Sequence, residues 1–256
     1  MYTTLNDLTI YYEKYGEKDK CILILPGWGN TRETFHYIIN HFKKNYTIYI
    51  LDYPGLGNSP IPAKSLTIYD YTELIISFMK QENISNPIII AHSFGGRLTT
   101  LLTGYYKIQI DKLILIDIAG IKPKKTLKKI IKEKTYKILK KIIKLLPKLK
   151  QEIYHQKLLK IFASTDYNAL PPTMHQTFKN IVNEDLTKYF PSINSEALII
   201  WGENDQDTPL KDAIKIKKMI KNSALIILKK AAHYSYLQYP YLVNNIIYEY
   251  IKQKEL

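Results

Sequence analysis

Four runs of aliphatic residues constrain the fold of this chain more than any other feature of its sequence. The runs are CILIL, IIIA, KLILI and ALII, which begin at residues 21, 88, 112 and 197. Runs without alternating polar residues are typical of parallel strands that are covered on both faces. Together with three further apolar segments, they predict strands at residues 8–15, 22–26, 46–52, 87–92, 112–118, 196–201 and 224–229.

Helical patterns separate these strands, at residues 31–43, 67–82, 94–105, 209–220 and 240–253. This alternation predicts an α/β fold, in which helices flank both faces of a mostly parallel sheet. It is interrupted once, because residues 121–192 show only helical sequence, broken by Pro147 and by Pro171 and Pro172. We therefore expect an α/β core made of residues 1–120 and 193–256, with a helical cap inserted at residues 121–192.

The N-terminal sequence and the cysteine content bear on the compartment. The segment MYTTLNDLTIYYEKYG lacks the charged start and apolar run of a signal peptide. No uncharged apolar stretch approaches the roughly 20 residues that a membrane-spanning helix needs. Cys21 is the only cysteine, so no internal disulfide can form, and its place in an apolar run indicates a buried core residue. We expect a cytoplasmic protein.

A serine stands between the second of the four aliphatic runs and the helix that follows it, in the sequence Ala91-His92-Ser93-Phe94-Gly95-Gly96. Small residues lie two positions before Ser93 and two and three positions after it. They would allow a sharp strand-to-helix turn in which the two backbones nearly touch. Ser93 could merely cap the helix, but that role does not explain the small residues. We interpret Ser93 as a nucleophile.

A serine nucleophile needs a general base, normally a histidine, and a carboxylate that orients it. Ligands of α/β sheets bind beyond the carboxyl ends of the strands, so the loops there are the place to search. His233 follows the last strand. His92 is a neighbour of Ser93, and adjacent side chains of a strand point to opposite faces, which favours a structural role. The other histidines lie on helical segments: His36, His41, His155 and His175. The candidate acids are Asp205, Asp207 and Glu203 in one loop, and Asp117.

The chain resembles the α/β-hydrolase family over nearly its whole length outside the insertion. AHSFG resembles the G-x-S-x-G nucleophile elbow, with Ala91 in place of the first glycine. WGENDQDTP resembles the loop that carries the acid, and AAHYSYLQYP resembles the segment that carries the base. LPGWGN resembles the H-G-x-G oxyanion loop, with Pro26 in place of histidine, and DYPGLGNS resembles the D-x-x-G-x-G-x-S turn.

This resemblance implies a triad of Ser93, Asp205 and His233, and an oxyanion hole made by the backbone N–H groups of Trp28 and Phe94. It implies an esterase that hydrolyses carboxylic esters through an acyl-enzyme. No Cys or His cluster has metal-ligand spacing and no GxGxxG motif follows the first strand, so we expect no metal and no cofactor. Related hydrolases of thioesters, lactones or C–C bonds, acyltransferases and non-catalytic binding proteins remain alternatives. Trp28 is either a substrate-binding aromatic or a packing contact, and we expect Arg97 to form a structural ion pair.

Almost the whole formal charge of +14 lies on one segment, since residues 121–160 contain 15 lysines and two acids, Glu133 and Glu152. Apolar residues recur there at helical spacing, at Leu127, Ile130, Ile131, Ile138, Ile142 and Leu145. The simplest expectation is a helix whose apolar face covers the substrate site and whose lysines face water. An anionic membrane surface and an acidic carrier protein are alternative partners, but nucleic acid is not expected. GWG and KAAH resemble carboxylesterases that demethylate pimeloyl-acyl carrier protein methyl ester.

Overall fold

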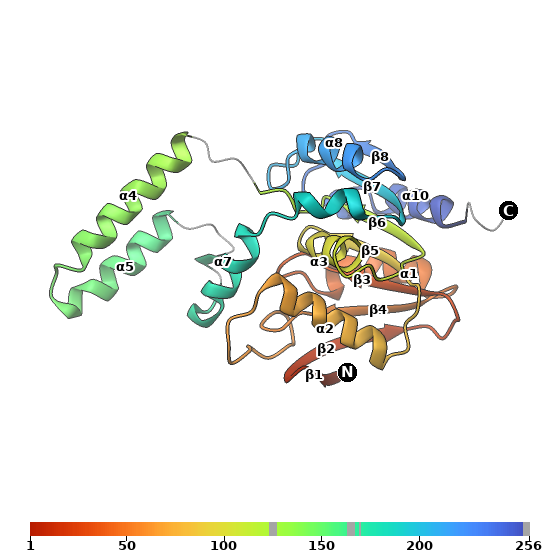
Figure 1. The fold of residues 1–256 in the computed structure, drawn as a ribbon, viewed down its shortest axis with the longest axis horizontal. Helices are drawn as coiled ribbons and strands as arrows, with labels where there is room; N and C mark the ends of the chain where they lie inside the picture. Colours follow the sequence, from red (N-terminus) through yellow and green to blue (C-terminus); the bar gives the residue numbers. More distant parts are fainter. Residues whose placement is uncertain (123–126, 163–166, 169, 253–256) are drawn as a thin grey trace.

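A computed structural model describes residues 1–122, 127–162, 167–168 and 170–252. Its centre is an eight-stranded sheet with the strand order β1-β2-β4-β3-β5-β6-β7-β8 (Figure 1). The six strands from β4 to β8 in this order are parallel, whereas β1 and β2 pair antiparallel at one edge. The strands are β1 (Tyr2–Leu5), β2 (Leu8–Tyr15), β3 (Cys21–Leu25), β4 (Thr47–Asp52), β5 (Ile88–His92), β6 (Lys112–Ile116), β7 (Glu196–Gly202) and β8 (Ser223–Leu228).

The mostly parallel sheet and the seven predicted strands are confirmed, but strand β1 was not predicted. This strand is short and partly exposed, so it lacks the apolar run that marks the others. It turns into β2 at Asn6 and Asp7, which both have positive φ angles, of 50° and 62°. Positive φ at two successive residues is the geometry of a tight hairpin, and Asn and Asp tolerate it better than most residues.

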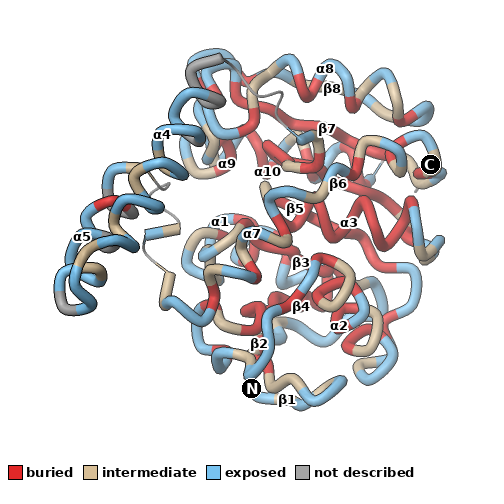
Figure 2. The backbone as a smooth tube through the Cα atoms, turned by 60° about the vertical axis from the view of Figure 1, so that its left-hand side comes forward, coloured by how far each residue is buried: buried red, intermediate tan, exposed pale blue. Residues whose placement is uncertain are grey.

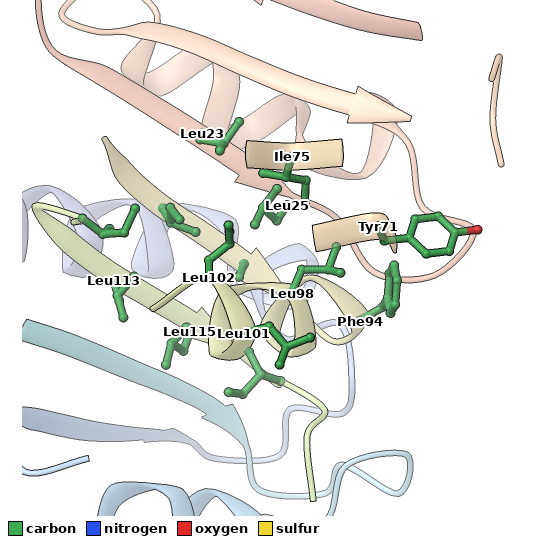
Figure 3. Packing of buried hydrophobic residues seen from close by; sticks show 14 of the residues in the cluster. Leu23, Leu25, Tyr71, Ile75, Phe94, Leu98, Leu101, Leu102, Leu113 and Leu115 are labelled. Carbon is green, nitrogen blue, oxygen red and sulfur yellow. The ribbon is translucent and has the colours of Figure 1, made fainter. Parts of the chain in front are cut away.

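Helices cover both faces of the sheet, as the alternating pattern predicted. Successive strand residues point to opposite faces, so Leu23 and Leu25 of β3 pack into one cluster while Ile22 and Ile24 pack into the other. Helices α2 (Ile68–Gln81), α3 (Phe94–Gly104) and α8 (Leu210–Met219) cover the first face. Helices α1 (His36–Phe42) and α10 (Pro240–Lys252) cover the second. Figure 3 shows the first cluster around α3, whose leucines lie against α2 and the strands.

The sequence between β6 and β7 is helical and contains no strand among its described residues. Its helices are α4 (Leu127–Ile143), α5 (Lys148–Phe162), the 3-10 helix η2 (Pro172–Met174), α7 (His175–Asn183) and the 3-10 helix η3 (Thr187–Ser192). Helices α4 and α5 form a hairpin that stands apart from the sheet (Figure 1), and Figure 2 shows it as mostly exposed. Across the described part of the chain, no helix combines the length and apolar content that a membrane crossing requires.

The C-terminal part of this insertion packs on the α/β core. Leu186 and Phe190 are fully buried in the cluster around α3. The Arg97 guanidinium of α3 donates a hydrogen bond of 2.8 Å to the backbone carbonyl of Glu184, and burial lowers its pKa to about 10. We expected Arg97 to form an ion pair, but this hydrogen bond goes to a main-chain oxygen. Arg97 thus connects the helix that follows Ser93 to the insertion.

The apolar face that was expected to cover the site is exposed, so that prediction was wrong. Ile131, Ile138, Ile142 and Leu145 expose 51–86% of their surface. The side chains of Leu127 and Ile130 lie outside the described residues. A different face of α4 packs on α5, because the Tyr136 ring contacts the ring of Phe162 at 5.8 Å.

Candidate active site

Ser93 lies at the sharp turn between β5 and α3. Its backbone has φ 46° and ψ −109°, a left-handed conformation that is strained for a residue with a side chain. Hydrogen bonds from both sides hold it there. The Ser93 N–H donates to the carbonyl of Ile116 at 3.2 Å, and its carbonyl accepts from the N–H groups of Gly96 and Ala119 at 3.0 and 2.9 Å. The strained backbone is therefore fixed by the end of β6 and the loop after it.

The small residues after Ser93 are required by close backbone contacts. A Cβ atom on Gly95 would lie 1.9 Å from the carbonyl oxygen of Leu25, and one on Gly96 would lie 2.2 Å from the Cβ atom of Ile118. Helix α3 therefore approaches the end of β3 and the loop after β6 more closely than any side chain at these positions allows. This arrangement raises Ser93 above the carboxyl edge of the sheet.

The structure brings Ser93, His233 and Asp205 together in one chain of hydrogen bonds. The Ser93 Oγ atom lies 3.0 Å from Nε2 of His233, and the Nδ1 atom of the same ring lies 2.8 Å from Oδ2 of Asp205. The Asp205 side chain is fully buried, and the His233 side chain exposes 12% of its surface. This is the geometry in which a carboxylate orients an imidazole that can accept the serine proton.

The surroundings of Asp205 favour its charged form. Burial by itself would raise the pKa of this carboxyl group, but hydrogen bonds from His233 and Thr208 lower it overall. Oδ1 accepts from the backbone N–H groups of Asp207 and Thr208 at 2.8 and 2.9 Å. Oδ2 accepts from the Thr208 hydroxyl at 2.7 Å. Burial likewise acts to lower the pKa of His233, but the hydrogen bond to Asp205 and its charge raise that pKa overall.

Among the described residues, none of the other candidate acids forms a hydrogen bond with the His233 ring. Asp207 is exposed, and Glu203 accepts from the backbone N–H of Lys230. Asp117 is fully buried and binds backbone and hydroxyl donors instead. Its Oδ1 accepts from the Gly202 N–H at 2.7 Å, and its Oδ2 accepts from the N–H and hydroxyl of Ser235 at 3.2 and 2.6 Å. Burial raises the pKa of Asp117 to about 7.

His92 forms a hydrogen bond with the backbone of His233. Its Nε2–H donates to the carbonyl oxygen of His233 at 2.8 Å, and its Nδ1 lies 3.3 Å from the side-chain nitrogen of Asn30. Burial lowers the pKa of His92 to about 3, which keeps the ring neutral. Gly27 leaves room for this ring, because a Cβ atom there would lie 2.7 Å from Nδ1 of His92. The prediction that His92 is structural rather than the general base agrees with these contacts.

The remaining histidines lie elsewhere. His36 and His41 belong to α1 and are exposed. The ring of His175, at the start of α7, stacks on Tyr167 with 4.0 Å between the ring centroids. His155 lies on α5, but its side chain is outside the described residues.

Phe94 and Trp28 lie side by side next to Ser93. Phe94 is the first residue of α3, and the N–H groups in the first turn of a helix have no partner within the helix. The Trp28 ring contacts the Phe94 ring edge-on at 5.2 Å, and it also contacts Tyr71 of α2 and Phe178 of α7. Trp28 therefore joins the loop after β3 to both the core and the insertion. Its buried indole N–H has no hydrogen-bond partner among the described residues.

Asp205, Asp207 and His233 also form a group whose potential metal-ligand atoms lie within 4.8 Å of one another. The Nδ1 atom of His233 already binds Asp205 in this group, and Asp205 accepts three further hydrogen bonds. A cation there would displace the hydrogen bond that orients the imidazole. The donor set therefore fits a hydrogen-bonded triad better than a metal site.

Comparison with known proteins agrees with the observed fold. The sequence model described as alpha/beta hydrolase fold matches residues 20–136. An esterase from Exiguobacterium antarcticum superposes with a TM-score of 0.76 over 98% of this chain and 99% of its own, at 22% identity. The chain has the α/β-hydrolase fold.

Relatives of this α/β-hydrolase fold chain carry the names of several hydrolases. A Pseudomonas putida protein named 2-hydroxy-6-oxononadienedioate/2-hydroxy-6-oxononatrienedioate hydrolase 1 is 21% identical over 96% of this chain and 92% of its own length. A Mycoplasma genitalium protein provisionally named esterase/lipase 2 is 27% identical over 80% of this chain and 79% of its own. The chain is thus similar to proteins that carry different hydrolase names.

Proposed function

We propose that this protein is a serine hydrolase that cleaves carboxylic esters. The observation that carries the proposal is the hydrogen-bonded chain from Ser93 through His233 to Asp205, with Ser93 on a strained turn at the N-terminus of a helix. A serine that merely capped α3 would accept a hydrogen bond from the helix backbone, but its side chain makes no such cap. Its hydroxyl faces the imidazole instead.

The reaction follows from these positions. His233 Nε2 removes the hydroxyl proton while Ser93 Oγ attacks the acyl carbon, and Asp205 stabilises the imidazolium that forms. The backbone N–H groups of Phe94 and Trp28 are proposed to bind the oxyanion, each contributing about 10²–10³ in rate. The imidazolium then gives its proton to the leaving alcohol, and the acyl group remains on Ser93. Water, deprotonated by His233, attacks this acyl-enzyme and releases the carboxylic acid.

Hydrolysis of p-nitrophenyl esters of increasing chain length tests this proposal. We expect turnover by the wild-type protein and a loss of about 10⁴–10⁶-fold in kcat for Ser93→Ala and for His233→Ala. Matched controls are Ser85→Ala and His41→Ala, which change an exposed serine and an exposed histidine and should retain turnover. Turnover that persists in Ser93→Ala would refute the mechanism.

Hydrolysis of a C–C bond is a second candidate, because the Pseudomonas putida relative whose name gives a 2-hydroxy-6-oxo dienedioate as its substrate aligns with 96% of this chain. The test is the hydrolysis of a 2-hydroxy-6-oxo dienoate by the same set of variants. Rapid turnover of the dienoate with no turnover of any ester would replace the ester proposal.

A carrier-bound methyl ester is a narrower version of the ester proposal, supported by the GWG and KAAH motifs. Comparing the carrier-bound ester with the free methyl ester tests it.

A further inference from the structure

The hairpin of α4 and α5 has an exposed apolar stripe that no described element covers. Ile131, Ile138 and Ile142 fall within a sector about 40° wide, at about 100° per residue, and expose 63%, 58% and 51% of their surface. Leu145 continues the stripe into the turn after α4 and is 86% exposed. Isolated exposed aliphatic residues are ordinary, but an aligned set on one helix is typical of an interaction surface.

A row of three lysines borders this stripe on one side. Lys134, Lys137 and Lys141 are exposed and follow the apolar stripe along α4, about a quarter of a turn away. On the other side of the stripe lie Leu139 and Ile143, which are partly buried, and Lys132, whose ammonium group lies 5.8 Å from the centre of the Phe162 ring of α5. The free surface of α4 is therefore divided lengthwise into an apolar strip and a basic strip.

Helix α5 also exposes apolar residues and lysines on one side, but there the two kinds of residue are mixed. Ile153, Tyr154 and Ile161 are exposed, with 56%, 47% and 68% of their surface accessible. Lys150 and Lys157 lie among them on the same side of the helix and are also exposed. Leu158, on the face that packs on α4, is buried.

Both exposed stripes lie on the same side of the hairpin. In each helix, the packed face lies about a third of a turn around the helix axis from the exposed stripe. Viewed from the N-terminus of each helix, the rotation from stripe to packed face has the same direction. Figure 1 shows that the two helices are antiparallel and lie side by side. In such a pair, a common offset directs both stripes to one side. The turn between them is held by Gln151, whose amide donates to the carbonyls of Lys144 and Leu146 at the end of α4.

We propose that this side of the α4–α5 hairpin binds the surface of an anionic lipid bilayer. A bilayer offers both kinds of partner at once, since aliphatic side chains enter the headgroup region while lysines remain at the phosphates. A second copy of the chain would bring two lysine-rich surfaces together, because residues 121–160 contain 15 lysines and two acids. An acidic protein would match the lysines but leaves the isoleucines unexplained. The proposal is independent of the reaction at Ser93.

The test is sedimentation of the full-length protein with vesicles of phosphatidylcholine, with and without phosphatidylglycerol. We expect binding only to the mixed vesicles, and weaker binding at high salt. In Lys134→Gln/Lys137→Gln/Lys141→Gln, affinity should fall about a hundredfold, at about fivefold per lysine near the surface. The matched control is Lys211→Gln/Lys215→Gln/Lys218→Gln, which removes the same charge from exposed positions of α8 and should bind as wild type.

The apolar stripe is tested separately by Ile131→Ser/Ile138→Ser/Ile142→Ser. These side chains are exposed, so thermal melting should stay unchanged while binding falls at least tenfold. Equal losses in the α4 and α8 lysine variants would refute the proposal, because binding would then reflect net charge alone. Absence of binding to either vesicle would also overturn it and would favour an acidic protein as the partner. Ser93→Ala should bind vesicles as wild type, so failure of the esterase proposal would leave this result intact.

Discussion

We predict that Gly95→Ala will abolish most activity by displacing Ser93. The added methyl group would lie 1.9 Å from the carbonyl oxygen of Leu25, and real contacts of this kind are essentially never under 3.0 Å, so one backbone must move by at least 1.1 Å. Neither atom belongs to a flexible side chain. The displacement will be transmitted to Ser93, two residues away, whose Oγ lies only 3.0 Å from His233 Nε2. A misplacement of about 1 Å costs about a hundredfold in rate.

The assay is kcat on a p-nitrophenyl ester together with thermal melting, and its matched control is Gly104→Ala at the far end of α3. A Cβ atom there would lie 2.5 Å from the carbonyl oxygen of Tyr189. Both variants should melt at a lower temperature, since overpacking costs about 1–3 kcal/mol. Only Gly95→Ala should lose about a hundredfold in kcat. If Gly95→Ala retains kcat within twofold, or if both variants lose it equally, the reasoning from this contact is wrong.

Three further predictions concern the hydrogen bonds of the site. The pKa of His233 is raised above its ordinary value, and the reaction needs its neutral form, so kcat/KM should fall as pH decreases through a midpoint above the usual 6.5; a midpoint below 6.5 in the pH–rate profile would contradict this. Thr208→Val removes the hydroxyl bonded to Asp205 and should lower stability by about 1.5–3 kcal/mol in denaturant unfolding, while Thr208→Ser should retain it; equal losses would refute a hydroxyl effect. Asp117→Asn places an NH₂ group against the N–H of Gly202 or the donors of Ser235 and should lower the free energy of unfolding by about 1–3 kcal/mol. In the wild type, the raised pKa of Asp117 should make stability fall as pH rises from about 3.8 to about 7, and this fall should be absent in Asp117→Asn. A pH–stability curve identical to that of the wild type would contradict the raised pKa of Asp117.

The three triad positions could be predicted from the sequence because each follows a parallel strand. Ser93 comes after β5, Asp205 after β7 and His233 after β8, and the carboxyl ends of parallel strands meet at one edge of the sheet. The choice of Asp205 over Asp117 came from resemblance, since both residues follow a strand at that edge. The structure gives the physical reason for the difference, because Asp117 is already occupied by the donors of Gly202 and Ser235.

The contacts that support the triad could not be predicted in the same way. Thr208 and His92 act through hydrogen bonds to residues that are 3 and 141 positions away in sequence. A threonine before a proline carries no local signal of such a contact. The acceptor for His92 is a backbone carbonyl, which every residue possesses. Such partners become visible only when the loops after β5, β7 and β8 are placed together.

The expectation for α4 failed for a related reason. Its helical spacing correctly indicates an apolar stripe at Ile131, Ile138 and Ile142, but periodicity does not say what covers a stripe. The helix has a second apolar face at Tyr136, and that face packs on α5. The insertion reaches the site through α7 instead, where Phe178 contacts Trp28. Substitutions on the exposed stripe should therefore leave hydrolysis of a short-chain ester unchanged, whereas Phe178→Ala should alter KM or the preferred acyl length. An equal effect of both on KM would mean that α4 also contacts the substrate.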